Sequence, residues 1–201
     1  MNLILASASP RRQELLRIFG CPFTVRAADI DETMDPEKPP FDEVARVSRS
    51  KEVAHVSRQK AQAIAAGQDD VIIAADTIVV CCGKVLGKPK DAQDAHRMLS
   101  LLSGRDHQVM TGCTVIRGSR AVTFTEVTDL HFRPLLPQEI RRYILTGEPM
   151  DKAGAYGIQG GGALFCQRME GDYYNVMGLP LCRLGQVLRD MAPEIWEDEA
   201  K

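Results

Sequence analysis

The sequence lacks the features that would assign it at once to a membrane, secreted or nucleic-acid-binding class. No apolar segment approaches the roughly 20 residues that a membrane-spanning helix needs. The net charge is only −2, so no overall positive field favours nucleic acid. The start has neither a basic region nor a long apolar run, so we expect no signal peptide. These absences favour a cytoplasmic globular protein with neither a membrane nor a nucleic-acid partner.

Metal and nucleophile motifs are also missing. The six cysteines form no C-x-x-C pair and the four histidines have no metal-ligand spacing. Most cysteines lie among apolar residues, which predicts reduced core side chains, with metal binding as the weaker alternative. We find no Ser-His-Asp arrangement, P-loop spacing or repeat. The length of 201 residues allows one domain, expected over residues 1–192, with a frayed acidic tail at 193–201.

Apolar strands and amphipathic helices alternate along the chain and predict an α/β protein. We expect a mixed, twisted sheet with flanking helices and two lobes around a central cleft. The predicted strands are 1–6, 22–28, 71–80, 84–86, 108–116, 121–132 and 163–169. The predicted helices start at Pro10, cover 41–66, run between Asp91 and Gly104, and cover 137–145 and 180–189.

The junction between the first strand and the first helix predicts an anion site. Ser9 suits the N-cap and Pro10 the first helical position. The two arginines that follow fall in the first turn, where the helix dipole disfavours cations. Guanidiniums, hydroxyls and free backbone N–H groups at one helix start favour phosphate. A capped helix whose arginines reach solvent or a remote carboxylate is the alternative of comparable weight.

Asp76 interrupts an apolar strand and is the most informative carboxylate. A charge there is costly unless it is paired or binds a metal, so Asp76 is a candidate general base or metal ligand. The alternative places it where the strand reaches the surface. Lys88 lies in the rigid Gly87-Lys88-Pro89 loop just after the next strand and can point at the group that Asp76 faces. Taken alone, Lys51 is typical of a solvated helix surface.

Gln159 lies in the glycine-rich run 157–162. Glycines allow a backbone to approach another group closely, although such runs are usually simple turns. The amide of Gln159 offers one donor and one acceptor, which match O4 and N3–H of uracil or thymine.

Five segments, in order, resemble motifs of the Maf family of nucleoside triphosphate pyrophosphatases. They are 5–12, 74–77 with 87–89, 102–104 with 107–112, 151–160, and 171–180. The resemblance covers nearly the whole chain and implies a Maf/ITPase-like fold that hydrolyses a triphosphate between its α- and β-phosphates. Ile-Gln-Gly at 158–160 resembles the subgroup that acts on dTTP and UTP. The subgroup that acts on 7-methyl-GTP has an acidic residue where Gln159 stands.

The resemblance also implies roles for individual residues. It implies a catalytic group in which Asp76 is the base and Lys88 and Lys51 lie beside the triphosphate. It also implies a substrate-binding group that consists of Ser7, Arg11, Arg12, Thr77 and Gln159. Within that group, the family links Arg11, Thr77 and Gln159 to the choice of base. Glu32, with Asp76, would hold a divalent cation, Mg²⁺ or Mn²⁺, since such ions take oxygen ligands.

Two other functions stay open at this point. One is the same chemistry on another nucleotide, such as 7-methyl-GTP, whereas modified pyrimidine nucleotides belong with dTTP and UTP in the main expectation. The other is a non-catalytic regulator of cell division, because the family is also linked to septum formation. A regulator has no need of a base, so the set of Asp76, Lys88, Ser7 and Arg12 argues for an enzyme. The oligomeric state is open, with a homodimer as one option.

Overall fold

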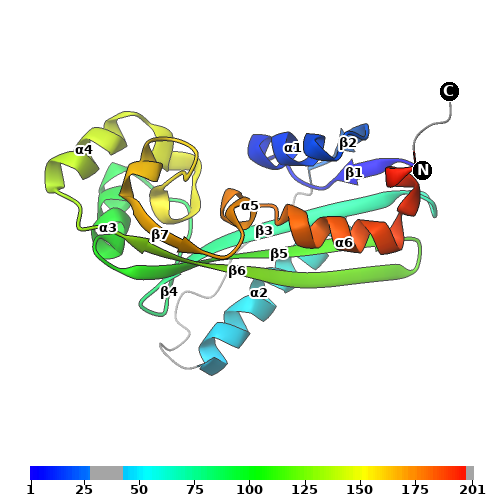
Figure 1. The fold of residues 1–201 in the computed structure, drawn as a ribbon, viewed down its shortest axis with the longest axis horizontal. Coiled ribbons are helices and arrows are strands. Elements are labelled where there is room, and N and C mark those ends of the chain that lie inside the picture. Colours follow the sequence, from blue (N-terminus) through cyan, green and yellow to red (C-terminus); the bar gives the residue numbers. More distant parts are fainter. Residues whose placement is uncertain (28–42, 198–201) are drawn as a thin grey trace.

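The computed structural model describes residues 1–27 and 43–197, which form one long sheet with helices on both faces (Figure 1). The strands are β1 (Leu3–Leu5), β2 (Phe23–Val25), β3 (Val71–Cys81), β4 (Lys84–Leu86), β5 (Asp106–Arg117), β6 (Arg120–Phe132) and β7 (Cys166–Glu170). The helices are α1 (Pro10–Leu16), α2 (Glu43–Gln62), α3 (Ala92–Leu102), α4 (Pro137–Leu145), α5 (Tyr173–Met177) and α6 (Leu181–Met191). Short 3₁₀ turns cover Arg17–Phe19, Glu148–Asp151, Ala153–Ala155, Gly161–Phe165 and Pro193–Trp196.

The sheet is mixed, as the sequence predicts. Its order is β2-β1-β3-β5-β6-β7, and β4 pairs with the far end of β3. β1 runs parallel to both of its neighbours, while the other pairs in the described part of the chain are antiparallel. Helix α2 crosses one face, and α1 and α6 lie on the other (Figure 1). The predicted sheet with flanking helices is therefore confirmed.

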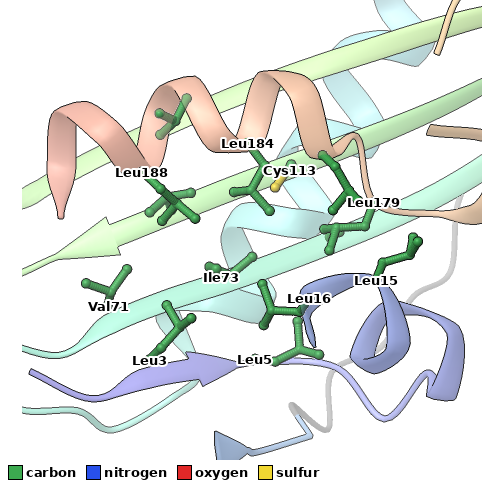
Figure 2. Close-up of a cluster of buried hydrophobic side chains, with 14 of the residues drawn as sticks. Leu3, Leu5, Leu15, Leu16, Val71, Ile73, Cys113, Leu179, Leu184 and Leu188 are labelled. Carbon is green, nitrogen blue, oxygen red and sulfur yellow. The ribbon is translucent and has the colours of Figure 1, made fainter. Parts of the chain in front are cut away.

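Two large hydrophobic clusters lie at opposite ends of the sheet and give the protein its two lobes. In the first, leucines of α1 and α6, such as Leu15 and Leu188, pack against Ile73 of β3 (Figure 2). In the second, α3 and α4 pack over the other ends of the long strands, around Leu99 and Phe132. Each fully buried leucine of this kind contributes about 1.5–3 kcal/mol.

Several predicted boundaries agree closely with the structure. The strand 84–86 and the helix 137–145 match residue for residue. Asp91 caps α3 by accepting the N–H of Asp94 at 2.8 Å, and Gly104 follows with a φ of 66°. Ser9 does occupy the N-cap position of α1, but its side chain makes no capping hydrogen bond. No described helix has the length and apolar character that a membrane crossing requires.

Other predictions were wrong, mainly after residue 145. The strand expected from residue 163 begins only at Cys166, because Gly161–Phe165 forms a 3₁₀ turn. The short helix α5 lies where a loop was expected. The described part of the tail does not fray: Glu194 pairs with Arg117 at 2.6 Å, and Trp196 packs edge-on against Phe19. The long helix expected to residue 66 ends at Gln62.

Candidate functional site

The candidate site lies where one edge of β3 has no neighbouring strand. β1 pairs with β3 only as far as Ile73, and β4 begins to pair only at Val79. Between them no described strand covers this edge, although β5 pairs with the other edge throughout. The gap opens into a cleft of about 970 Å³. This is at the upper end of the roughly 300–1,000 Å³ typical of small-molecule sites.

The cleft has two walls of different construction. We call the first the sheet wall; it consists of lining residues from 6–12, 60, 76–79 and 176–178. We call the second the loop wall; it consists of lining residues from the segment Glu148–Gly160. The remaining lining residues are Gly87 and Lys88, after β4, and Ala27, Val85 and Val109.

Side-chain alternation along β3 sends Asp76 and Thr77 to opposite faces of the sheet. Ile72 and Ala74 pack with Ala61 of α2, so Asp76, two residues on, faces α2. Ile73 belongs to the cluster under α1 and α6, so Thr77 faces those helices. The strand therefore offers a carboxylate on one side of the cleft and a hydroxyl on the other.

Lys60 of α2 supplies the partner that a buried carboxylate requires. Its Nζ donates to Oδ1 of Asp76 at 2.8 Å, and the two residues are only 6% and 8% exposed. A buried charge pair of this kind is costly to break from either side. Asp76 is thus an oriented carboxylate in the cleft lining, with a cation fixed beside it.

The structure does not bring Lys51 to the cleft. Lys51 is exposed and precedes Lys60 by nine positions on α2, about 2.5 helical turns, so the two side chains leave opposite sides of the helix. The sequence does hold a signal for Lys60. Val53, Val56 and Ala61 mark the buried face of α2 at helical spacing, and Lys60 falls on that same face. The structure therefore places Lys60, and not Lys51, beside Asp76, while the role of Lys51 at the triphosphate stays a prediction.

Gly112 lets α2 lie close to the strand that carries Asp76. It pairs directly with Asp76 across β3 and β5. A Cβ at this position would lie 2.5 Å from the carbonyl carbon of Val53 and 2.7 Å from the amide nitrogen of Ala54. Any larger residue would push the helix, and with it Lys60, away from the sheet.

Arg12 joins three parts of the sheet wall. Its Nε donates to the carbonyl of Gly178 at 2.8 Å, Nη2 to Thr77 Oγ1 at 2.9 Å, and Nη1 to Ser7 Oγ at 3.2 Å. Thr77 Oγ1 also lies 3.0 Å from Thr111 Oγ1. The structure thus brings Ser7, Arg12 and Thr77 together, and Arg12 both lines the cleft and holds its wall.

Arg11, Lys88 and Gln159 also line the cleft. Nη1 of Arg11 lies 3.8 Å from Oδ2 of Asp151, so this arginine reaches across to the loop wall. Lys88 and Gln159 are exposed. Glu32, predicted as a metal ligand, lies outside the described residues.

The loop wall contributes charges that the sequence did not single out. Nζ of Lys152 donates to the carbonyl of Glu148 and to Oδ1 of Asp151, each at 2.7 Å. The lining cations are Arg11, Arg12, Lys60, Lys88 and Lys152, and the lining acids are Asp76, Glu148 and Asp151. The described cleft therefore carries an excess of positive charge in a chain whose net charge is −2, which favours an anionic ligand.

The described residues contain no group of three His, Cys, Asp or Glu side chains that could hold a metal ion by itself. Asp76 is nevertheless a suitable single ligand. Mg²⁺ is commonly bound through one or two carboxylates together with the oxygens of a substrate phosphate. Within residues 1–27 and 43–197, Asp76 thus offers one carboxylate ligand to a cation that also binds a phosphorylated ligand.

Comparison with known proteins gives one consistent family. The family model described as "Maf-like protein" matches residues 2–191. A "dTTP/UTP pyrophosphatase" of Moorella thermoacetica is 48% identical over 97% of both chains. A protein of the same name from Halalkalibacterium halodurans is 51% identical over 93% of this chain and 94% of its own. One from Hahella chejuensis is 43% identical, over 98% and 96%.

Among solved structures, the Ham1 protein of Staphylococcus aureus covers 66% of this chain and 72% of its own. Its sequence is 13% identical and the TM-score is 0.39. A similarity at this level supports no conclusion about function.

Proposed function

The chain belongs to the Maf-like family, and from this premise we propose that it hydrolyses dTTP and UTP to the monophosphate and pyrophosphate. The observation that carries the proposal is a cleft in which the oriented carboxylate of Asp76 lies among five cations. Relatives that bear the name dTTP/UTP pyrophosphatase match almost the full chain. We place the activity in the cytoplasm, where nucleoside triphosphates are found.

The cations suit a triphosphate. Arg11 and Lys88 are partly or fully exposed in the lining and are therefore available to phosphate oxygens. Guanidinium and ammonium groups form charge-assisted hydrogen bonds with phosphate that are about twice as strong as neutral ones. Ser7 and Arg12 lie farther in, beside Thr77, where they would contact the phosphate end of the substrate.

Asp76 would act as the general base. Its carboxylate accepts a proton from a water molecule as the water oxygen bonds to the α-phosphorus. The bond from that phosphorus to the oxygen bridging to the β-phosphate breaks, and pyrophosphate leaves with that oxygen. Lys60, 2.8 Å from Oδ1, fixes the carboxylate during this step. A positioned base typically contributes about 10²–10⁴-fold to the rate.

We further propose that a divalent cation, Mg²⁺ or Mn²⁺, binds with the substrate. Asp76 is the described residue best placed to hold it, and Glu32 would be a second ligand. The cation would neutralise charge on the phosphate oxygens and the departing pyrophosphate.

Gln159 would read the base. It lies on the loop wall, is exposed and lines the cleft. Its amide offers a donor to O4 and an acceptor to N3–H of uracil or thymine. Cytosine reverses this pattern at both positions, so CTP should be a poorer substrate.

A substrate panel tests the proposal. The purified protein is given dTTP, UTP, CTP, GTP, 7-methyl-GTP and modified pyrimidine triphosphates, with Mg²⁺, with Mn²⁺ or with a chelator. We expect dTTP and UTP to be cleaved fastest, to yield monophosphate and pyrophosphate, and to need the cation. Preference for 7-methyl-GTP would contradict the substrate assignment. Nucleotide binding without pyrophosphate release would favour the non-catalytic regulator. Light scattering on the same preparation tests for a homodimer.

A further inference from the structure

One tyrosine–glutamate pair holds both ends of the short segment that carries Gln159. The hydroxyl of Tyr143 accepts the N–H of Gly157 at 2.9 Å and donates to Oε1 of Glu148, also at 2.9 Å. The other carboxylate oxygen, Oε2, accepts the N–H of Gly161 at 2.9 Å. The two anchored amides flank the tripeptide 158–160, so a single connected network fixes the segment on both sides.

The pair is itself rigidly placed. Tyr143 is 5% exposed in the last turn of α4, and its ring packs edge-on against Phe165 with centroids 5.1 Å apart. Burial raises the pKa of the Tyr143 hydroxyl, so it remains a donor to Glu148 at every physiological pH. Thr146 links the two residues along the chain, since its hydroxyl donates to the carbonyl of Tyr143 and accepts the N–H of Glu148.

The glycines of the segment are explained by this carboxylate. A Cβ at Gly160 would lie 2.5 Å from the carboxylate carbon of Glu148. One at Gly157 would lie 2.6 Å from Cε of Lys152 and 2.9 Å from Oε1 of Glu148. A Cβ at Gly161 would lie 3.1 Å from the ring of Tyr143. The chain therefore wraps around the Glu148 carboxylate closely enough to exclude side chains, and the group that the glycines let the backbone approach is part of the protein.

We propose that Tyr143 and Glu148 are positioning residues that determine nucleobase selectivity by fixing the orientation of the segment around Gln159. The selectivity half of this inference rests on the proposed function. Directional hydrogen bonds to a base edge require an amide held in one orientation. Four of the five lining cations belong to the sheet wall or to the turn after β4 and lie outside this network; the exception is Lys152, whose Nζ donates to the carbonyl of Glu148. Loosening the segment should therefore reduce discrimination between bases more than it reduces phosphate cleavage.

The test compares Tyr143→Phe with the matched control Tyr173→Phe, which alters a tyrosine that is 42% exposed on α5 and outside the cleft lining. Loss of the buried hydroxyl leaves the Gly157 amide and Oε1 of Glu148 without partners. We expect kcat/KM for dTTP and UTP to fall about tenfold, mostly through KM, and that for GTP to change by less than about twofold. Hydrogen exchange at residues 157–161 should become faster, and Glu148→Gln should be intermediate because it keeps one acceptor. The control should match the wild type.

The possible results of this experiment distinguish a failure of the inference from a failure of the proposed function. If dTTP, UTP and GTP activities all fall by one factor along with Tm, the pair is only structural and the inference is wrong. An unchanged base preference despite faster exchange would also overturn it. The ratio of Kd values for non-hydrolysable UTP and GTP analogues gives the same comparison without turnover. A wild-type protein that cleaves no triphosphate would therefore contradict the proposed function, while the binding ratio would still decide the inference.

Discussion

The two walls of the cleft are built by different means. The sheet wall takes its polar groups from regular elements: Asp76 and Thr77 from β3, Lys60 from α2 and Arg12 from α1. The loop wall, Glu148–Gly160, contains only short 3₁₀ turns and is held by side-chain hydrogen bonds. Asp76, Lys60 and Arg12 thus lie on regular elements, whereas the amide proposed to contact the base lies on a loop. A loop can be altered without disturbing the scaffold, which is how binding selectivity commonly diverges.

The walls are joined only weakly by charge. The ion pair between Arg11 and Asp151 spans 3.8 Å, with side chains 31% and 67% exposed. An exposed pair of this kind contributes about 0–1 kcal/mol. Ile158 provides an apolar link, since it packs against both hydrophobic clusters. The polar groups of the two walls should therefore respond separately to substitution, although Val79 of the sheet wall shares a buried cluster with Tyr156 of the loop wall.

The largest effect on the sheet wall is expected for Lys60→Met. It removes the cation from the buried carboxylate of Asp76, and breaking a buried ion pair from one side costs about 3–5 kcal/mol. Stability and kcat should both fall. Lys51→Met on the same helix should leave both unchanged, because that side chain is exposed and outside the cleft lining. Denaturant unfolding and dTTP kinetics on the pair of variants decide between the two lysines, and equal effects would show that the cleft has been misassigned.

Lowering the pH should destabilise the protein through His107, which contacts a residue of the loop wall. Burial lowers the pKa of His107 to about 4, from 6.5. Its Nε2 lies 2.9 Å from the hydroxyl of Tyr156, which lines the loop wall. As pH falls from 6.5 to 4, the His107 imidazole becomes protonated in the unfolded state but stays neutral in the folded state. Stability is therefore lost over this range, by up to about 3 kcal/mol.

The measurement is the free energy of unfolding between pH 4 and pH 7 for the wild type and for His107→Gln. The variant should be less stable at pH 7 but should show a flatter pH dependence. If both proteins lose the same stability between pH 6.5 and pH 4, another group is responsible.

Gln159→Glu should change base selectivity without changing stability. An ionised carboxylate has no donor for O4 of uracil or thymine, which leaves two acceptors facing each other. The cost is on the order of 1–3 kcal/mol, or about ten- to a hundredfold in kcat/KM for dTTP and UTP. GTP should be affected less. A uniform loss for dTTP, UTP, CTP and GTP would mean that Gln159 supports the loop rather than reading the base.

The smallest effect is expected for the stability of Arg12→Ala. Removing a cation from the first turn of α1 would by itself raise stability by about 0.3–1 kcal/mol. The structure shows, however, that the guanidinium bonds to Gly178, Thr77 and Ser7. Leaving these partners unsatisfied outweighs the helix term, so we expect a net loss of about 1–2 kcal/mol together with weaker triphosphate binding. A stabilised variant would show that these bonds contribute nothing.

The two walls also differed in how well the sequence predicted them. The strand around Asp76 has a continuous apolar run, and α3 and α4 have clear start signals, so their positions were predicted closely. The lysine on α2 was missed because the buried face of that helix carries Ser57 and Ala61 beside its two valines and therefore contrasts weakly with the exposed face.

The loop wall has no periodic signal at all. Its geometry depends on contacts between Tyr143, Glu148 and the glycines, which belong to different elements and become neighbours only after folding. The run of glycines indicated a close backbone approach, but it did not reveal that the approached group was a carboxylate of the same chain. Local sequence rules have no means of identifying such a partner.

The most direct test of the account is the turnover of Asp76→Asn. Its dTTP hydrolysis is compared with that of the wild type at saturating Mg²⁺, below the Tm of both proteins, with binding of a non-hydrolysable dTTP analogue measured in parallel. Asparagine keeps the shape of the side chain but has no carboxylate to accept the proton from water. We expect kcat to fall about 10²–10⁴-fold while the analogue still binds. Turnover close to the wild type in a variant confirmed to carry the change would contradict the claim that this buried carboxylate is the catalytic base.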